Sequence, residues 1–87
     1  MSEVGRGEVV QMESLSAGGI PGRFTWRGRR HTVRAVASVR SVSRAGHGLA
    51  GRRWIELRTD SGMRCLVSVD GRDGLWRMER VLPTRGG

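Results

Sequence analysis

Apolar and polar residues alternate in short runs from residue 23 onward, and glycine interrupts most of these runs. Alternation with a period of two is typical of strands that bury one face, because successive side chains of a strand point to opposite sides. No segment shows a sustained helical period. The pattern therefore predicts an all-β chain built from antiparallel strands and tight turns.

Several segments depart from this regular alternation. Residues 8–15 (EVVQMESL) alternate imperfectly and predict an edge strand, whereas residues 16–22 (SAGGIPG) are rich in breakers and predict a linker. Residues 44–51 (RAGHGLAG) predict a flexible loop. Four valines recur at a spacing of three, which fits neither a regular strand nor a helix: Val33, Val36, Val39 and Val42. A bulged strand or one helical turn near residues 36–42 accounts for that spacing.

The first predicted hairpin turns at Gly28–Arg29, a Gly-X dipeptide suited to a two-residue type II′ turn. The strand pairs are then Arg27 with Arg30, Trp26 with His31, Thr25 with Thr32, Phe24 with Val33, and Arg23 with Arg34. One face carries Phe24, Trp26, His31 and Val33, and the other carries the arginines. A three-residue loop would place Trp26 opposite Arg30 and mix the two faces, so the hydrophobic pattern favours the shorter turn.

Two further hairpins follow. Residues 59–62 (TDSG) suit a three-residue loop with Gly62 in the left-handed conformation, and residues 71–74 (GRDG) suit a four-residue turn. The apolar pairs that result are Leu57 with Cys65, Ile55 with Val67, Val69 with Trp76, and Val67 with Met78. On the outer face, the same register places Arg58 directly opposite Arg64.

Together these hairpins predict one all-β domain of five or six antiparallel strands, arranged as a meander that curls into a small open barrel. The domain is expected to span residues 9–83, between flexible tails at 1–8 and 84–87. A chain of 87 residues has room for only one core. Trp26 and Trp76 fall on the apolar face and are predicted to lie in that core.

Composition adds a strong positive charge to this picture. All sixteen basic residues are arginine, the formal net charge is +8, and the sequence pI is about 11.8. Such an excess favours binding to polyanions. The single cysteine, Cys65, excludes an internal disulfide. The N-terminus resembles neither a signal peptide nor a membrane anchor, so we expect a cytoplasmic protein with no membrane partner.

The predicted registers place arginine opposite arginine three times. Like charges directly opposite each other destabilise a sheet by up to about 1 kcal/mol per pair. A bound phosphate would offset this cost, since guanidinium binds phosphate through two hydrogen bonds. The candidate nucleic-acid-binding residues are therefore Arg23, Arg27, Arg30 and Arg34, with Arg58 and Arg64. The alternative is a solvated face, or a face that contacts an acidic protein.

Trp54 falls on the same outer face as Arg58 and Arg64. It is either buried in a second layer or exposed as a stacking platform for bases, as in binders of single-stranded nucleic acid.

Other motifs do not indicate catalysis. Residues 46–51 (GHGLAG) match the glycine pattern of dinucleotide-binding loops, but a strand follows them and the chain is too short for that fold. The residues His31, His47 and Cys65 are too scattered for a metal site, and His31 is expected beside Trp26 at the rim of the core. The carboxylates form no evident acid–base pair. We therefore predict no enzyme activity, no cofactor and no metal.

The segments RFTWRGRRHTVR, TDSG and GLWRMERV (within residues 20–82) resemble a small actinobacterial all-β domain family of unknown function. Members of that family occur alone or beside Y-family polymerase-like translesion proteins. The resemblance implies an all-β module in a DNA-damage or translesion setting, without established catalysis. Taken with the arginine-rich face, it predicts a non-catalytic accessory module that contacts the phosphates of a nucleic acid, DNA in the first instance, without reading its sequence. The alternative is a module that docks on an acidic surface of a larger replication or repair protein. The oligomeric state stays open.

Overall fold

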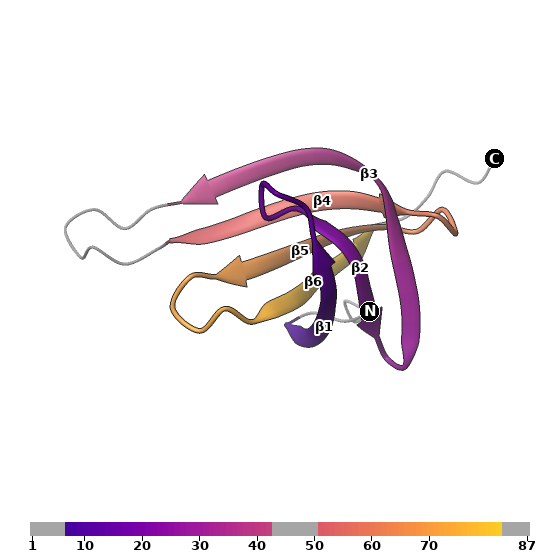
Figure 1. Cartoon of the computed structure of the whole chain (residues 1–87), viewed down its shortest axis with the longest axis horizontal. Coiled ribbons are helices and arrows are strands. Elements are labelled where there is room, and N and C mark those ends of the chain that lie inside the picture. The colour runs from indigo at the N-terminus through magenta and orange to yellow at the C-terminus, as the bar shows by residue number, and fades with distance from the viewer. Residues whose placement is uncertain (1–6, 43–50, 83–87) are drawn as a thin grey trace.

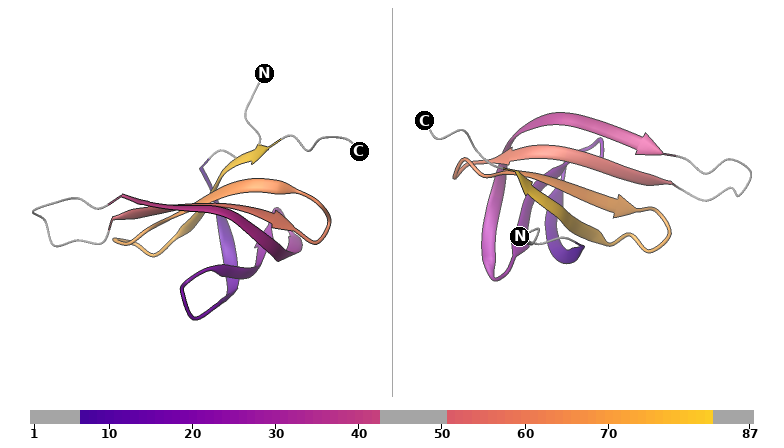
Figure 2. Two further views of the ribbon diagram at one scale, coloured as in Figure 1. Left: turned by 90° about the horizontal axis from the view of Figure 1, so that it is seen from above. Right: turned by 180° about the vertical axis from the view of Figure 1, so that it is seen from behind.

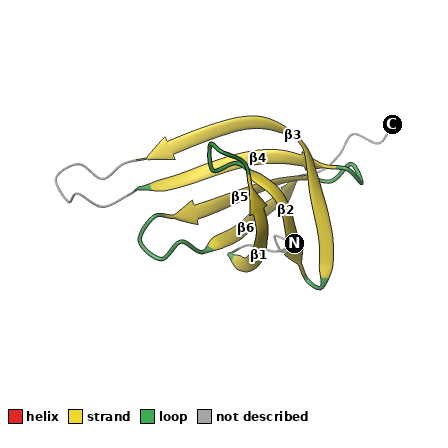
Figure 3. Ribbon diagram, in the orientation of Figure 1, coloured by secondary structure: helices red, strands yellow, loops and turns green. Residues whose placement is uncertain are grey.

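The computed structural model describes residues 7–42 and 51–82, which form strands and no helix (Figure 3). The strands are β1 (Glu8–Leu15), β2 (Pro21–Trp26), β3 (Arg29–Val42), β4 (Arg52–Thr59), β5 (Arg64–Asp70) and β6 (Trp76–Leu82). Each pairs antiparallel with the next, and β1 also pairs with β6, so the strands close into a barrel (Figure 1). The predicted all-β meander is confirmed, with closure where an open barrel was expected. The described residues contain no helix that could cross a membrane.

The N-terminal segment takes a larger part in the barrel than the sequence suggested. The expected edge strand, β1, is paired on both sides, with β2 and with β6. Glu8, which we assigned to the tail, is the first residue of this strand. The predicted linker ends earlier than residue 22, because Pro21 and Gly22 already belong to β2. A proline is tolerated at the first position of a strand, where its missing N–H costs little.

The β2–β3 hairpin corrects one predicted register. Phe24 lies opposite His31 and Trp26 opposite Arg29, so the two turn residues are Arg27 and Gly28. Both have positive φ, 54° at Arg27 and 75° at Gly28, as in a type I′ turn. The predicted type II′ turn at Gly28–Arg29 and the pair of Arg27 with Arg30 are therefore wrong. The pairing moved by two residues in all, so Phe24, Trp26 and His31 kept their predicted face, whereas Arg27 left the outer face for the turn.

The other two hairpins have the predicted registers. Leu57 lies opposite Cys65 and Arg58 opposite Arg64, and Gly62 has a φ of 93° in the three-residue loop between them. On the next ladder, Val67 pairs with Met78 and Val69 with Trp76. A bulge between Leu66 and Val67 places Glu79 outside the regular pairing on β6.

The long strand β3 changes partner along its length. Its first residues pair with β2, and from Val33 onward it pairs with β4, with bulges at Arg34 and Ala37. The bulged strand expected near residues 36–42 is confirmed. From Val33 to Val42, β3 lies beside β4, which pairs with β5 along nearly its whole length, so β3 is here the outer strand next to β4 (Figure 2). The predicted 44–51 loop and His47 lie outside the described residues, except for Gly51, as do residues 1–6 and 83–87.

Every strand except β3 contributes buried apolar side chains to the core of the barrel. The buried side chain from β3 is that of His31. The buried apolar residues are Val10, Phe24, Trp26, Ile55, Leu57, Cys65, Val67, Trp76 and Met78. Trp26 and Trp76 are therefore core residues, as predicted. Because successive side chains alternate, burial of these residues leaves Arg23, Arg58 and Arg64 on the outer surface of the same strands.

Candidate functional site

Arg27 is held by a carboxylate of this chain. Its Nε donates to Glu8 Oε1 at 2.9 Å, and its Nη2 pairs with Glu8 Oε2. The guanidinium also lies 4.8 Å from the centre of the Trp26 ring. The indole N–H of Trp26 donates to the same carboxylate at 2.9 Å. The hydrogen bond from Arg27 lowers the pKa of Glu8 and raises that of Arg27. Arg27 is thus part of a structural cluster rather than an open anion site.

Arg30 is also paired within the chain. Its Nε lies 3.3 Å from Oε1 of Glu13. Arg30 is on β3 and Glu13 is on β1, so this ion pair reaches across β2, which lies between them. Glu13 also accepts a hydrogen bond from the hydroxyl of Thr25, which lies between them on β2. The sequence analysis missed both Glu8 and Glu13 as partners, because only the pairing of β1 with β2 brings them close. The sequence feature that could have identified these two partners is their position in residues 8–15, the segment predicted as a strand.

Arg58 and Arg64 lie opposite each other on the outer face, as predicted, and the bulge of β3 places Arg34 next to them, which the sequence did not predict. Arg58 lies directly opposite Arg64. Arg34 occupies the bulge beside Ala35, which is the partner of Arg58 on β3. Arg64 donates to Glu56 at 2.8 Å, whereas Arg34 and Arg58 form no ion pair with any described carboxylate. Glu79 on β6 accepts a hydrogen bond from the hydroxyl of Ser68 at 2.6 Å.

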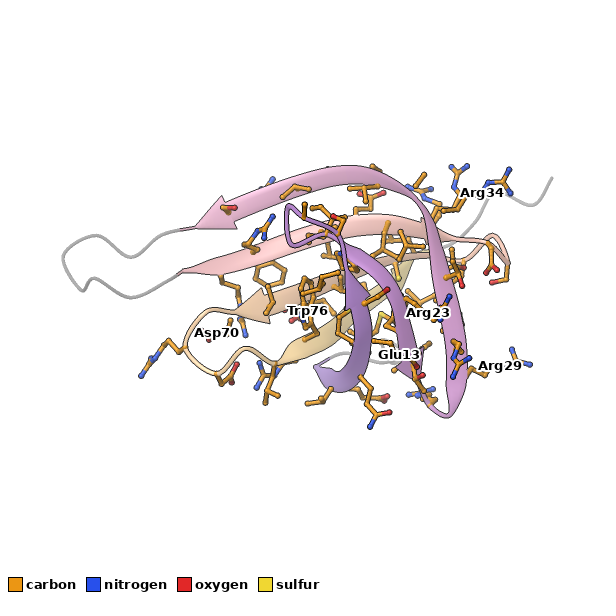
Figure 4. All side chains as sticks on the ribbon, in the orientation of Figure 1. Glu13, Arg23, Arg29, Arg34, Asp70 and Trp76 are labelled. Atoms are coloured by element: carbon orange, nitrogen blue, oxygen red, sulfur yellow. The ribbon has the colours of Figure 1, made fainter. Side chains whose placement is uncertain are left out.

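Arg23 extends this group onto β2. It lies opposite Thr32, two residues before Arg34, and makes no ion pair within residues 7–42 and 51–82. Diagonal neighbours on one face of a sheet are close enough for long side chains to act together. We call Arg23, Arg34, Arg58 and Arg64 the basic face; it crosses β2, β3, β4 and β5. Figure 4 shows that Arg34 points outward where β3 bends, far from Asp70.

Trp54 lies on the predicted outer face but is only half-buried. Its neighbours across the ladders are Arg40 and Ser68, and the guanidinium of Arg52 lies 5.3 Å from the ring centre. Four residues along β4 separate it from Arg58, which corresponds to about 13 Å. Trp54 is therefore at the margin of the basic face, with one arginine already on its ring.

His31 is buried at the rim of the core beside Trp26, as predicted. Its ring stacks on Phe24, with 5.3 Å between ring centres, and its buried Nε2 has no hydrogen-bond partner within the described chain. Burial lowers the pKa of His31, and the charge of Arg29 adds to this effect. Among the described residues, no three His, Cys, Asp or Glu side chains cluster to hold a metal.

The lowered pKa of His31 predicts acid sensitivity in a defined pH range. The unfolded chain protonates this histidine below pH 6.5, its ordinary pKa, whereas the folded protein does so only at lower pH. Stability should therefore fall as the pH drops below 6.5. Urea unfolding at pH 7.5 and 5.5 measures this loss. In H31F the difference should shrink markedly, and an unchanged pH dependence in that variant would contradict the assignment.

Cys65 is fully buried, as expected for a small apolar residue, and burial raises its pKa to about 12. Since only the thiolate reacts, this shift alone slows alkylation by about a thousandfold relative to an ordinary thiol with a pKa of 9.0. We expect iodoacetamide at pH 8 to label the native protein very slowly and the urea-unfolded protein rapidly. Mass spectrometry follows both reactions, and comparable rates would show that Cys65 is accessible in the folded state.

Comparison of the chain with family models, curated proteins and solved structures finds no match. The case for function therefore depends on the geometry of the basic face.

Proposed function

We propose that the protein is a non-catalytic module that binds nucleic acid through the phosphates, with the basic face as its contact surface. The observation that carries this proposal is the direct opposition of Arg58 and Arg64, with Arg34 in the adjacent bulge. Bringing these charges together costs stability, and Glu56 neutralises only one of them. A row of phosphates would compensate the others.

The distribution of the acidic residues supports the same surface. Glu8 pairs with Arg27 and Glu13 with Arg30, and Asp73 pairs with Arg77. These three carboxylates therefore form their ion pairs with arginines outside the basic face. Other described arginines, such as Arg40 and Arg72, also form no ion pair with a described carboxylate, but Arg34 and Arg58 are distinguished by lying next to each other and to Arg64. The proposed site is therefore smaller than the one predicted from sequence. Arg27 and Arg30 stabilise the fold, and the arginines of the basic face contact phosphates. Such contacts position a protein on nucleic acid without reading bases.

The resemblance of the RFTWRGRRHTVR segment to domains found beside translesion polymerases favours DNA as the nucleic acid, and a cytoplasmic role in DNA repair or translesion synthesis. Trp54, at the margin of the basic face, would add stacking for an unpaired base. Its half-exposed ring makes single-stranded DNA the first substrate to test.

The test is a fluorescence-anisotropy titration with a labelled single strand of about 20 nucleotides. It is repeated at several salt concentrations from about 50 to 300 mM, a range that includes the physiological value. With three phosphate contacts, the logarithm of the affinity should fall with the logarithm of salt with a slope of about −2. Absence of binding at the lowest salt would refute the proposal. Binding to an acidic protein instead should show a shallower slope and depend on a single aromatic residue.

A further inference from the structure

The second half of β3 has a free edge. Within the described residues, β2 pairs with β3 only as far as Thr32, and from Val33 to Val42 β3 is paired on one side only, by β4. Figure 1 shows this part of β3 as the outermost strand of the sheet that it forms with β4, β5 and β6. Backbone N–H and C=O groups along such an edge can pair with an added strand.

An apolar stripe runs beside this edge. Val36 and Val39 lie opposite Leu57 and Ile55, on the face that forms the core. Yet Val36 and Val39 are 38% and 45% exposed, whereas Leu57 and Ile55 are 1% and 0% exposed. The core is thus complete up to β4 and stops at β3. Apolar side chains from one more strand would continue it over the two valines.

The charge of β3 indicates what kind of strand fits. Its sequence, RRHTVRAVASVRSV, contains four arginines and no acidic residue. Arg34 and Arg40 lie at the two ends of the free edge and are both exposed. A second copy of β3 paired here would bring arginine against arginine, which destabilises a ladder. Carboxylates on the added strand would instead be attracted to both ends.

We propose that residues 35–41 of β3 bind an extended segment of a partner protein by strand addition, and that this segment alternates apolar and acidic residues. Its apolar side chains cover Val36 and Val39, and its carboxylates lie on the opposite face, beside Arg40. The contact is about 20 Å long at roughly 3.3 Å per residue. This site goes beyond the proposed function and does not depend on it, because its central residues are not those of the basic face.

The test uses a capped octapeptide of alternating valine and glutamate and follows the backbone amides of the isotopically labelled protein by NMR. Addition of the peptide at millimolar concentration should slow hydrogen exchange of amides between Ala35 and Ser41. The same peptide methylated on alternate backbone nitrogens, on the edge that faces β3, should have no effect. Unchanged exchange along residues 35–41 with the unmodified peptide would overturn the proposal.

Charge reversal provides the matched test. R40E should weaken binding of the valine–glutamate peptide at least several-fold and favour a valine–lysine peptide, whereas R72E, which makes the same change in the β5–β6 turn, should do neither. Equal losses in both variants would indicate attraction by net charge alone and overturn the proposal. Peptide-induced changes centred on Arg23, Arg58 and Arg64 would place the peptide on the basic face instead. Protection of residues 35–41 that rises with protein concentration alone would identify a second copy as the occupant.

Discussion

Replacing Phe24 with alanine is expected to remove about 3–5 kcal/mol from the free energy of unfolding. The Phe24 side chain is 0% exposed and stacks on His31 inside the barrel. Truncation would leave a cavity that neighbouring strands cannot close, because β2 is fixed by ladders on both sides. A domain of this size is stabilised by only about 4–13 kcal/mol in total, so this loss is a large share of its free energy of unfolding.

Urea unfolding followed by tryptophan fluorescence measures this effect, since Trp26 and Trp76 are buried in the same core. The matched control is V9A, which truncates an exposed side chain on β1 and should change stability by less than about 0.5 kcal/mol. A loss below about 1 kcal/mol for F24A would mean that the barrel interior is loosely packed at this position.

The double variant R34A/R58A is expected to lose most of the affinity for single-stranded DNA. A slope of about 0.7 per contact makes each phosphate contact contribute about fivefold at 0.1 M salt relative to 1 M, so loss of two contacts should weaken binding about 25-fold. The salt slope should also become shallower by about 1.4, since each contact to a single strand accounts for about 0.7. Anisotropy titrations of the variant and the parent protein at the same series of salt concentrations give both quantities.

The sharpest comparison is with R27A/R30A, which removes the same formal charge. These two guanidiniums are engaged by Glu8 and Glu13, so their loss should reduce affinity much less. Equal effects of the two double variants would show that total charge, and not the basic face, governs binding. R72A provides a second control, because it removes one exposed charge from the β5–β6 turn.

Stability should respond in the opposite sense in the two double variants. R58A relieves the repulsion from Arg64, which lies directly opposite, so R34A/R58A should be as stable as the parent or slightly more so. R27A releases the carboxylate of Glu8 and uncovers the Trp26 ring, so R27A/R30A should unfold more readily. Melting curves of both variants therefore separate arginines that support the fold from those that burden it. This pattern is expected where a surface is built for a ligand rather than for stability.

The basic face and the free edge of β3 divide the molecule between two kinds of contact. The basic face crosses four paired strands of the barrel, whereas the edge is the part of β3 that only β4 pairs, from Val33 to Val42. A module with both would connect a phosphate backbone to an extended segment of another protein. R58A should weaken only the contact of the face and R40E only that of the edge, whereas Arg34 borders both.

The alternation of side chains and the glycine turns were enough to predict the all-β meander and two of its registers. At residues 59–62 and 71–74, the turn chemistry and the apolar pattern require the same pairing, so Arg58 opposite Arg64 could be derived from sequence. The faces of β2 and β3 were also predictable, because the correct turn differs from the expected one by a two-residue change in pairing, which preserves side-chain direction.

Only the tertiary structure decided the turn itself and the fate of its arginines. Local preference disfavours arginine with positive φ, which argued for a turn with glycine first. In the folded chain, β1 brings Glu8 against Arg27 and Trp26, and these contacts stabilise the conformation that the isolated hairpin would avoid. The pairing of β1 with β2 and β6 joins segments far apart in sequence, and no local pattern reports which carboxylate will meet which arginine. For the same reason, the free edge of β3 became visible only once every strand had its partners.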